Sequence, residues 1–350
     1  MQQEASDYMN IMREFKLNEK KRLLNVLWGE AVDRPPVICP GGMMSACVTE
    51  IIGDIEANHN LDCDAMVMAA RKIYDKTGFE NYGVPFAMIA EAEPLGIKID
   101  NGNKMLEERV IEYNNEPVES IMSKYKIDPK CEGRMGIVIN AIEKLKNDEV
   151  PVIGNITGHI STATSVVDPL IIFKMIRKDP DKVYKFFGFI NDYLKEYARE
   201  MIRAGADVIA ISDPTATGEI LGSKNFEKFA VPFYKELINE VHKFNVPVIV
   251  HICGNAKTII GGLNQINTNA ASFDSIVNMR FAKSQLNSKL MGNVSTQLLH
   301  TGEKNKILSI TKNCIDSGVD IVSPACGLSM ATPVDNLKVM TDFVKRGIYD

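Results

Sequence analysis

Eight short apolar segments, spread along the chain, limit what this sequence can fold into. Each is apolar through its length, as strands covered on both faces are, and most are followed by a stretch with helical periodicity. Alternating strands and helices predict an α/β fold with a parallel sheet, and eight such units predict a TIM-type (β/α)8 barrel. We therefore predict one domain over residues 1–350. The eight segments lie near residues 37, 86, 151, 208, 248, 273, 290 and 321.

A doubly wound open sheet is the alternative architecture for this pattern. Such a sheet usually carries a nucleotide site, yet no Gly-x-Gly-x-x-Gly follows the first apolar segment and no phosphate-binding P-loop occurs anywhere in the chain. The barrel is therefore favoured, and a nucleotide-dependent enzyme is disfavoured.

Two stretches fall outside the repeating pattern. Residues 1–34 predict an N-terminal helical extension, which Pro35 and Pro36 would end. Residues 96–117 predict a hairpin insertion, because two alternating segments flank the turn signal Asn101-Gly102.

Charge and hydropathy exclude several classes of protein. The net charge is −5 and no basic cluster stands out, so we do not expect nucleic acid as a partner. No segment has eighteen uninterrupted apolar residues and the first twenty residues are polar, so we expect neither a membrane span nor a signal peptide. We expect a cytoplasmic protein, in which the seven cysteines stay reduced and need separate explanations.

The most specific chemistry lies in the segment Val248–Gly254. His251 and Cys253 are two positions apart at the end of a strand, so their side chains fall on the same side of the backbone. Cys326 follows the last apolar segment and would reach the same barrel mouth. Two thiolates and one imidazole suit zinc, and three protein ligands leave a fourth position for water or substrate. The plain alternative is a hydrogen-bonded histidine beside two buried thiols, but the placement of both halves at strand ends favours the metal.

Other polar residues also follow predicted strands. Asp213 could orient a ligand, bond to a zinc-ligating imidazole, or cap the next turn, and His159 is similarly placed, so both are candidate catalytic residues. Asn155 is a weaker candidate at a strand end. Glu91 or Glu93 could supply a displaceable fourth zinc ligand.

Longer motifs connect these residues to a known family. The segments 20–36 and 326–336 bound a region, nearly the whole chain, that resembles the uroporphyrinogen decarboxylase superfamily. The His-x-Cys pair and the distant Cys326-Gly327 resemble the corrinoid methyltransferase branch, typified by methylcobamide:coenzyme M methyltransferases. The resemblance implies an α/β barrel, zinc (Zn2+) on His251, Cys253 and Cys326, and methyl transfer between a corrinoid protein and a zinc-bound thiol such as coenzyme M.

The loop after the first predicted strand departs from the decarboxylase branch. Decarboxylases carry an arginine there for a substrate with many carboxylates, whereas this loop has no basic residue. Its small apolar residues Gly41, Gly42 and Met43 suit the face of a corrin, and with Asn155 we predict them as cofactor contacts. Three alternatives stay open: a demethylase that methylates the corrinoid protein from a small methylated substrate, a decarboxylase-like tetrapyrrole enzyme, and a non-catalytic corrinoid binder.

Overall fold

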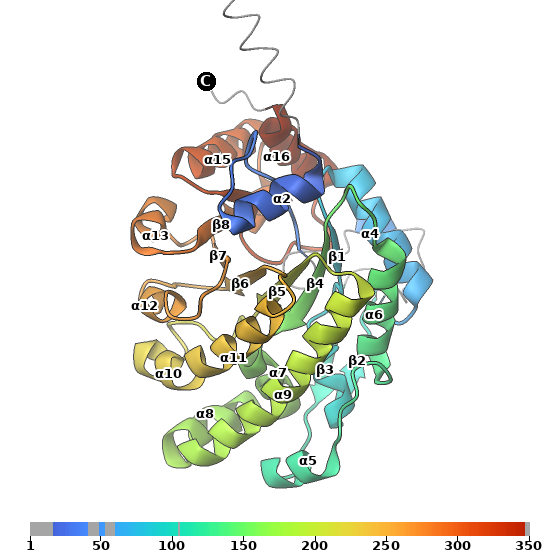
Figure 1. The fold of residues 1–350 in the computed structure, drawn as a ribbon, viewed down its shortest axis with the longest axis vertical. Coiled ribbons are helices and arrows are strands. Elements are labelled where there is room, and N and C mark those ends of the chain that lie inside the picture. Colours follow the sequence, from blue (N-terminus) through green and yellow to red (C-terminus); the bar gives the residue numbers. More distant parts are fainter. Residues whose placement is uncertain (1–16, 41–48, 53–59, 104–105, 347–350) are drawn as a thin grey trace, which may run out of the picture.

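Seven parallel strands form a curled sheet at the centre of the molecule, with helices around its outside (Figure 1). The computed structural model describes residues 17–40, 49–52, 60–103 and 106–346. The strand order is β1-β4-β5-β6-β7-β8-β9, so strands that follow one another in this sheet are also neighbours in space. This is the arrangement of a TIM-type barrel, and the predicted fold class is confirmed.

The bounds of the elements show strands alternating with helices through most of the chain. The strands are β1 (Tyr82–Val84), β2 (Lys98–Asp100), β3 (Arg109–Glu112), β4 (Val152–Thr157), β5 (Val208–Ser212), β6 (Val248–Ile252), β7 (Ala270–Phe273), β8 (Lys289–Val294) and β9 (Ile321–Pro324). The helices are α2 (Glu19–Trp28), α3 (Thr49–Ile52), α4 (Cys63–Thr77), the 3-10 helix η2 (Glu93–Leu95), α5 (Val118–Lys124), α6 (Gly133–Leu145), α7 (His159–Val166), α8 (Pro169–Lys178), α9 (Pro180–Ala204), α10 (Gly222–Phe229), α11 (Val231–His242), α12 (Ile260–Leu263), α13 (Met279–Gln285), α14 (Thr296–Thr301), α15 (Lys304–Asp316) and α16 (Val334–Arg346).

The first predicted strand closes the barrel without joining the regular sheet. Val37 forms a single parallel bridge with Val322 of β9, and the Ile38 amide donates to the Val322 carbonyl at 3.0 Å. On the other side, the Asn81 side chain exchanges two hydrogen bonds with the Cys39 backbone, at 2.9 and 3.0 Å. A side chain therefore replaces part of the strand pairing at this seam.

The strand β1 lies a few residues earlier in the chain than the second strand that the sequence predicts. The structure has β1 at Tyr82–Val84, in register with Val152–Gly154 of β4, whereas the apolar segment Pro85–Ala90 forms a loop. Pro85 has no amide hydrogen to continue the pairing, so the ladder ends before it.

The helices follow their sequence signals, with one exception. The α9 helix begins after the capping residue Asp179 and ends at Gly205, which has a φ of 117° that favours glycine. The apolar spacing over residues 226–244 predicts a single helix, but α10 and α11 are separate because Pro232 lies in the first turn of α11 and cannot continue α10. In the described part of the chain, no helix combines the length and the apolar character needed to span a bilayer.

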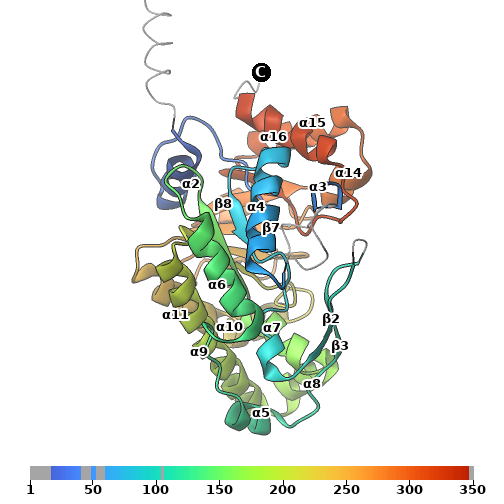
Figure 2. The ribbon, with the colours of Figure 1, turned by 90° about the vertical axis from the view of Figure 1, so that its right-hand side faces the viewer.

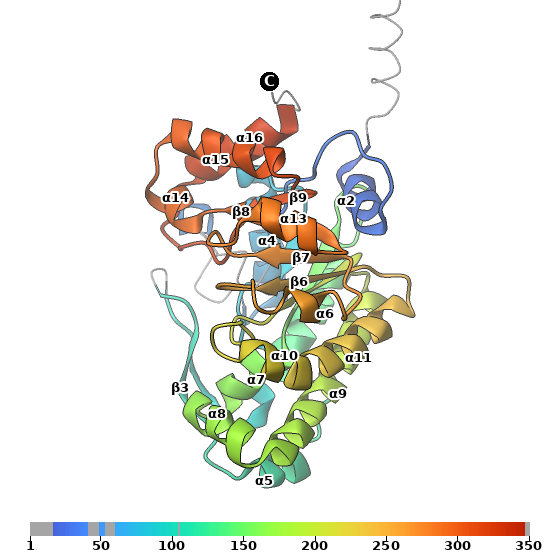
Figure 3. The same ribbon diagram turned by 90° about the vertical axis from the view of Figure 1, so that its left-hand side faces the viewer.

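Both predicted additions to the barrel are present where the structure describes them. The α2 helix belongs to the N-terminal extension, of which residues 1–16 lie outside the described residues. Strands β2 and β3 pair in antiparallel fashion as the predicted hairpin. The hairpin stands on the same side of the barrel as α14, opposite α2 (Figures 2 and 3). Since α14 directly follows β8, this side is the mouth formed by the carboxyl ends of the strands.

Candidate metal centre

His251 lies on β6, which pairs with another strand of the sheet on each side. In the parallel register it lies beside Ser212 of β5 and Ser272 of β7. Valines at positions 248 and 250 suit a buried central strand, and His251 itself is only 2% exposed. Rigid strands on both sides therefore fix the backbone that carries the imidazole.

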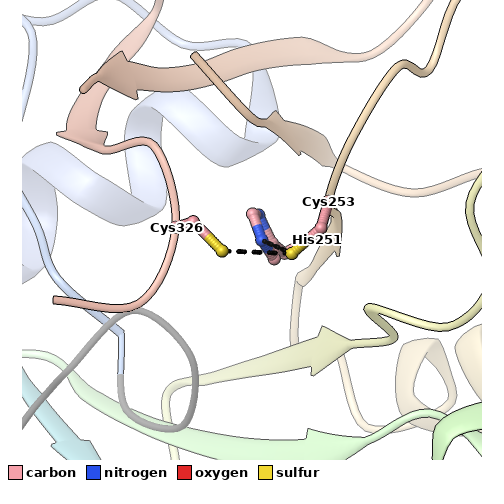
Figure 4. A group of neighbouring side chains, drawn as sticks. All are labelled: His251, Cys253 and Cys326. Carbon is pink, nitrogen blue, oxygen red and sulfur yellow. Dashed lines mark hydrogen bonds between the residues drawn. The ribbon is translucent and has the colours of Figure 1, made fainter. Parts of the chain in front are cut away.

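Cys253 and Cys326 reach the imidazole from two separate strands (Figure 4). Cys253 follows β6 and Cys326 follows β9, and their sulfur atoms lie 3.1 Å apart. The Cys253 sulfur is 3.2 Å from Nε2 of His251. One nitrogen and two sulfurs lie within 4.8 Å of one another, so the barrel brings together the three residues predicted as metal ligands.

The two thiols share a hydrogen bond that separates their acidities. The bond to Cys253, assisted by His251, lowers the pKa of Cys326 well below its usual value despite its burial. The same bond, together with burial, raises the pKa of Cys253 far above its usual value. Cys326 is therefore the first of the two thiols to lose its proton, and a metal would displace the proton that remains on Cys253.

Ser272 sets the orientation of the His251 ring. Its Oγ lies 3.0 Å from Nδ1 of His251, and Ser272 is completely buried. With Nδ1 held in this way, Nε2 is the ring nitrogen that faces the thiols, as in histidine–metal sites with a second hydrogen-bond partner. The sequence prediction missed Ser272; the only available signal was its place near the end of the next strand.

The chemistry of the donor set fits zinc. Two sulfurs and one imidazole nitrogen are ligands that zinc prefers, and they converge without any lysine or arginine side chain hydrogen-bonded to them among the described residues. No fourth protein ligand belongs to this group in the described ranges. Glu91 accepts a hydrogen bond from the Thr157 amide at 2.8 Å, and Glu93 pairs with Arg134.

Asp213 lies beside the metal centre but bonds to other partners. It is fully buried, and it accepts hydrogen bonds from the Ser161 amide at 2.9 Å and from the Tyr234 hydroxyl at 2.9 Å. The Ile160 amide also donates to it, at 3.3 Å. These contacts cap the first turn of α7, whereas the His251 ring bonds to Ser272. The predicted cap was of the turn after Asp213, whereas the helix capped here, α7, precedes β5 in the chain, and a catalytic role of Asp213 stays a prediction.

His159 is packed among aromatic rings at the start of α7. Its Nε2 lies 2.8 Å from the Phe229 carbonyl oxygen, and the rings of Phe187, Phe233 and Tyr234 surround it. Burial lowers the pKa of His159, so the ring is neutral at physiological pH. This environment favours a role in the core, and a catalytic role stays a prediction.

Of the four predicted cofactor contacts, the structure describes only Asn155. Asn155 is buried on β4, where its Nδ2 donates to the Val84 carbonyl at 3.2 Å and its Oδ1 has no protein partner among the described residues. Gly41, Gly42 and Met43 lie outside the described residues.

The sequence profile of uroporphyrinogen decarboxylase (URO-D) matches residues 18–347, which include the whole barrel and all three clustered ligands. The chain belongs to the uroporphyrinogen decarboxylase family. Within that family it falls in the branch whose named members are methyltransferases, as two comparisons show.

Methyltransferases of methanogens are similar to this family member over nearly their full length. The methylcobamide:CoM methyltransferase MtbA of Methanosarcina acetivorans is 30% identical over 335 residues, which cover 94% of this chain and 98% of the relative. The methylated-thiol–coenzyme M methyltransferase of Methanosarcina mazei is 25% identical over 332 residues, covering 92% of this chain and 88% of the relative. By contrast, the uroporphyrinogen decarboxylase of Thermodesulfovibrio yellowstonii matches 60% of this chain at 28% identity.

A solved structure supports the same branch of the family. A methyltransferase from Methanosarcina mazei superposes with a TM-score of 0.86 at 25% identity, covering 95% of this chain and 99% of that one. The corrinoid methyltransferase resemblance expected from the sequence is therefore confirmed.

Proposed function

We propose that this chain transfers a methyl group between a corrinoid protein and a small thiol at the centre formed by His251, Cys253 and Cys326. The observation that carries the proposal is the convergence of these three ligands at the barrel mouth, with no fourth protein ligand in the described residues. An open coordination position is a feature of catalytic rather than structural zinc sites. The names of the methanogen relatives, which pair methylcobamide with coenzyme M, support the corrinoid and the thiol.

When bound, zinc would hold the sulfur of the acceptor and keep it as a thiolate at neutral pH. The two cysteines favour this chemistry over activation of water, because two thiolate ligands donate charge and weaken the metal as an acid toward water. Ser272 keeps Nε2 of His251 directed at the centre. Cys253 follows β6 and Cys326 follows β9, so strands of the barrel sheet carry the ligands.

The bond changes in the proposed reaction balance without a further reactant. The acceptor sulfur donates an electron pair to the methyl carbon, and the carbon–cobalt bond of the partner's corrinoid breaks. Both electrons of that bond remain on cobalt, while the thiolate becomes a neutral thioether. The proton of the thiol leaves when the thiol binds, so the protein does not need a general acid at the methyl group.

Metal content and methyl transfer test the proposal together. We expect about one equivalent of zinc in the purified protein and loss of zinc in both Cys253→Ala and Cys326→Ala. Methylcobalamin should lose its methyl group to small thiols with the wild type and not with these variants. Cys131→Ala is the matched control, because Cys131 is exposed and lies far along the sequence from the centre. Zinc loading that is unaffected by both alanine variants would refute the proposal.

The reverse direction is a second candidate. In the name of one relative the donor is a methylated thiol, which would correspond to demethylation of a small substrate. In this case the corrinoid protein would receive the methyl group. The discriminating measurement is whether a free thiol or its methylated form protects the bound zinc from a chelator.

The remaining alternatives predict different results. A decarboxylase-like enzyme would need basic residues for its many carboxylates, yet residues 40–62 contain no lysine or arginine. A non-catalytic corrinoid binder would bind the corrinoid tightly without turnover and without metal.

A further inference from the structure

The loops that surround the metal centre are almost free of basic residues. In a barrel, the segments that follow the strands form the mouth where substrates bind. Four of these segments contain neither lysine nor arginine: 85–97, 158–168, 213–223 and 325–333.

Three of the basic side chains near the mouth have partners, whereas Arg280, exposed in the first turn of α13 after β7, has no ion-pair partner among the described residues. Lys257, in the loop after β6, lies over the Phe281 ring at 5.8 Å from its centre. In the hairpin, Lys98 pairs with Glu112 at 2.6 Å and Arg109 with Asp100 at 2.9 Å. Among the described residues that surround the centre, these three cations are therefore engaged away from it.

Carboxylates, by contrast, lie on three separate elements at this side of the barrel. Asp274, after β7, accepts a hydrogen bond at 3.3 Å from the amide of Gly254, the residue next to Cys253. Glu219, after β5, accepts one at 3.2 Å from the Asn255 amide. Glu107 lies just before β3 in the hairpin, which stands on the same side of the barrel as the centre (Figures 2 and 3).

The helix N-termini that could bind an anion at this mouth are occupied by the protein itself. Asp213 accepts from the amides of the first turn of α7. Glu50 accepts from the Val334 amide at the start of α16, at 3.1 Å. A helix N-terminus stabilises one negative charge well, so a second anion at either helix would meet repulsion from the first.

We infer that the thiol acceptor of this enzyme carries no anionic group, and is an uncharged or ammonium-bearing thiol rather than a sulfonate such as coenzyme M. The inference rests on the proposed function, since it concerns the substrate of the same centre. A sulfonate on a two-carbon chain would stay within a few Å of its sulfur, on the side of the barrel where Asp274, Glu219 and Glu107 lie. An ammonium or hydroxyl group at the same place would be attracted or tolerated.

Three thiols with the same two-carbon chain test the inference directly. They are 2-mercaptoethanol, cysteamine and 2-mercaptoethanesulfonate, whose head groups are neutral, cationic and anionic. Binding of each to the zinc-loaded full chain is measured by calorimetry at low ionic strength, and the affinities are compared at equal thiolate concentration. We expect the sulfonate to bind about tenfold or more weakly than the other two, and the gap to narrow at high salt.

Two charge-neutralising variants test whether these carboxylates cause the difference in affinity between the thiols. Glu107→Gln and Asp274→Asn should each strengthen binding of the sulfonate severalfold and leave 2-mercaptoethanol unchanged. Asp316→Asn removes an equal charge from the carboxyl end of α15, which leads to the opposite end of the barrel, and should change neither. Equal or tighter binding of the sulfonate overturns the inference while the proposed function stands. Failure of all three thiols to bind zinc-loaded protein overturns both.

Discussion

The hydroxyl of Ser272 holds Nδ1 of His251 at 3.0 Å, and this contact leaves Nε2 only 3.2 Å from the sulfur of Cys253. The two residues lie side by side on β6 and β7, in register and fully buried. A metal-binding histidine usually has such a partner on its other nitrogen, most often a carboxylate or a carbonyl. Here a serine takes that place, so the orientation of the ring depends on one neutral hydrogen bond.

Replacing Ser272 by alanine should weaken zinc binding. Loss of the hydrogen bond frees the ring to rotate, and changes of this kind lower metal affinity by about 10- to 100-fold. Competition with a chromophoric chelator measures the affinity directly. Ser284→Ala on α13 is the control, because that hydroxyl is exposed and bonds to its own helix. An affinity for Ser272→Ala equal to that of the wild type would show that packing alone orients the ring.

The metal-free protein should show one unusually acidic cysteine. The pKa of Cys326 lies well below its usual value because Cys253 donates a hydrogen bond to it, so its thiolate forms at a lower pH than that of an ordinary cysteine. The nearby Asp128 raises the pKa of the exposed Cys131, which stays a thiol until the pH exceeds its usual value of 9.0. At pH 6 iodoacetamide should therefore label Cys326 before Cys131, as read by peptide mass spectrometry. Cys253→Ala should abolish this preference, and faster labelling of Cys131 in the wild type would contradict the assignment.

Glu91 should make the fold less stable as the pH rises. Burial raises its pKa from 4.5 to about 7. The folded state therefore binds more protons than the unfolded state between these values, and its stabilising contribution is complete below pH 4.5 and is lost as the pH passes 7. Glu91→Gln, which mimics the protonated acid, should raise the free energy of unfolding at pH 8 by about 1–3 kcal/mol relative to the wild type, and by little at pH 4.5.

Urea unfolding at the two pH values measures this difference for Glu91. Asp316→Asn, which removes one negative charge from a partly exposed side chain on α15, controls for the change in net charge. A stabilisation by Glu91→Gln that is the same at both pH values would show that titration of this carboxyl is not its cause.

Substitutions at Asp213 distinguish a structural role of this residue from a catalytic one. Asp213→Ala leaves the α7 amides and the buried Tyr234 hydroxyl without their acceptor, which should cost about 2–4 kcal/mol of unfolding free energy. Zinc content should stay near that of the wild type, because Asp213 does not bond to the His251 ring. Asp213→Asn keeps one oxygen acceptor and should recover part of the stability. If Asp213→Asn folds and binds zinc normally but transfers no methyl group, Asp213 is catalytic.

The alternation of apolar strands and amphipathic helices was enough to predict the barrel. Parallel strands that are buried on both faces need helices with an apolar face to cover them. The errors arose where local chemistry overrides apolarity. Pro85 ends the β1 ladder by its missing amide hydrogen, and Pro232 divides a helix that hydrophobic periodicity made continuous. The seam at Val37 depends on the Asn81 side chain, which no periodicity reports.

The metal centre, too, could be predicted only in part from the local sequence. By itself the sequence determined that His251 and Cys253 share one side of a strand end, since the period of a strand is two residues, and that Cys326 follows another strand. Only the tertiary structure decided that the three atoms lie within 4.8 Å, that Ser272 orients the imidazole, and that Asp213 caps α7 instead. The physical reason is that these contacts depend on strand register and barrel closure, which join residues far apart in the chain and leave no local pattern.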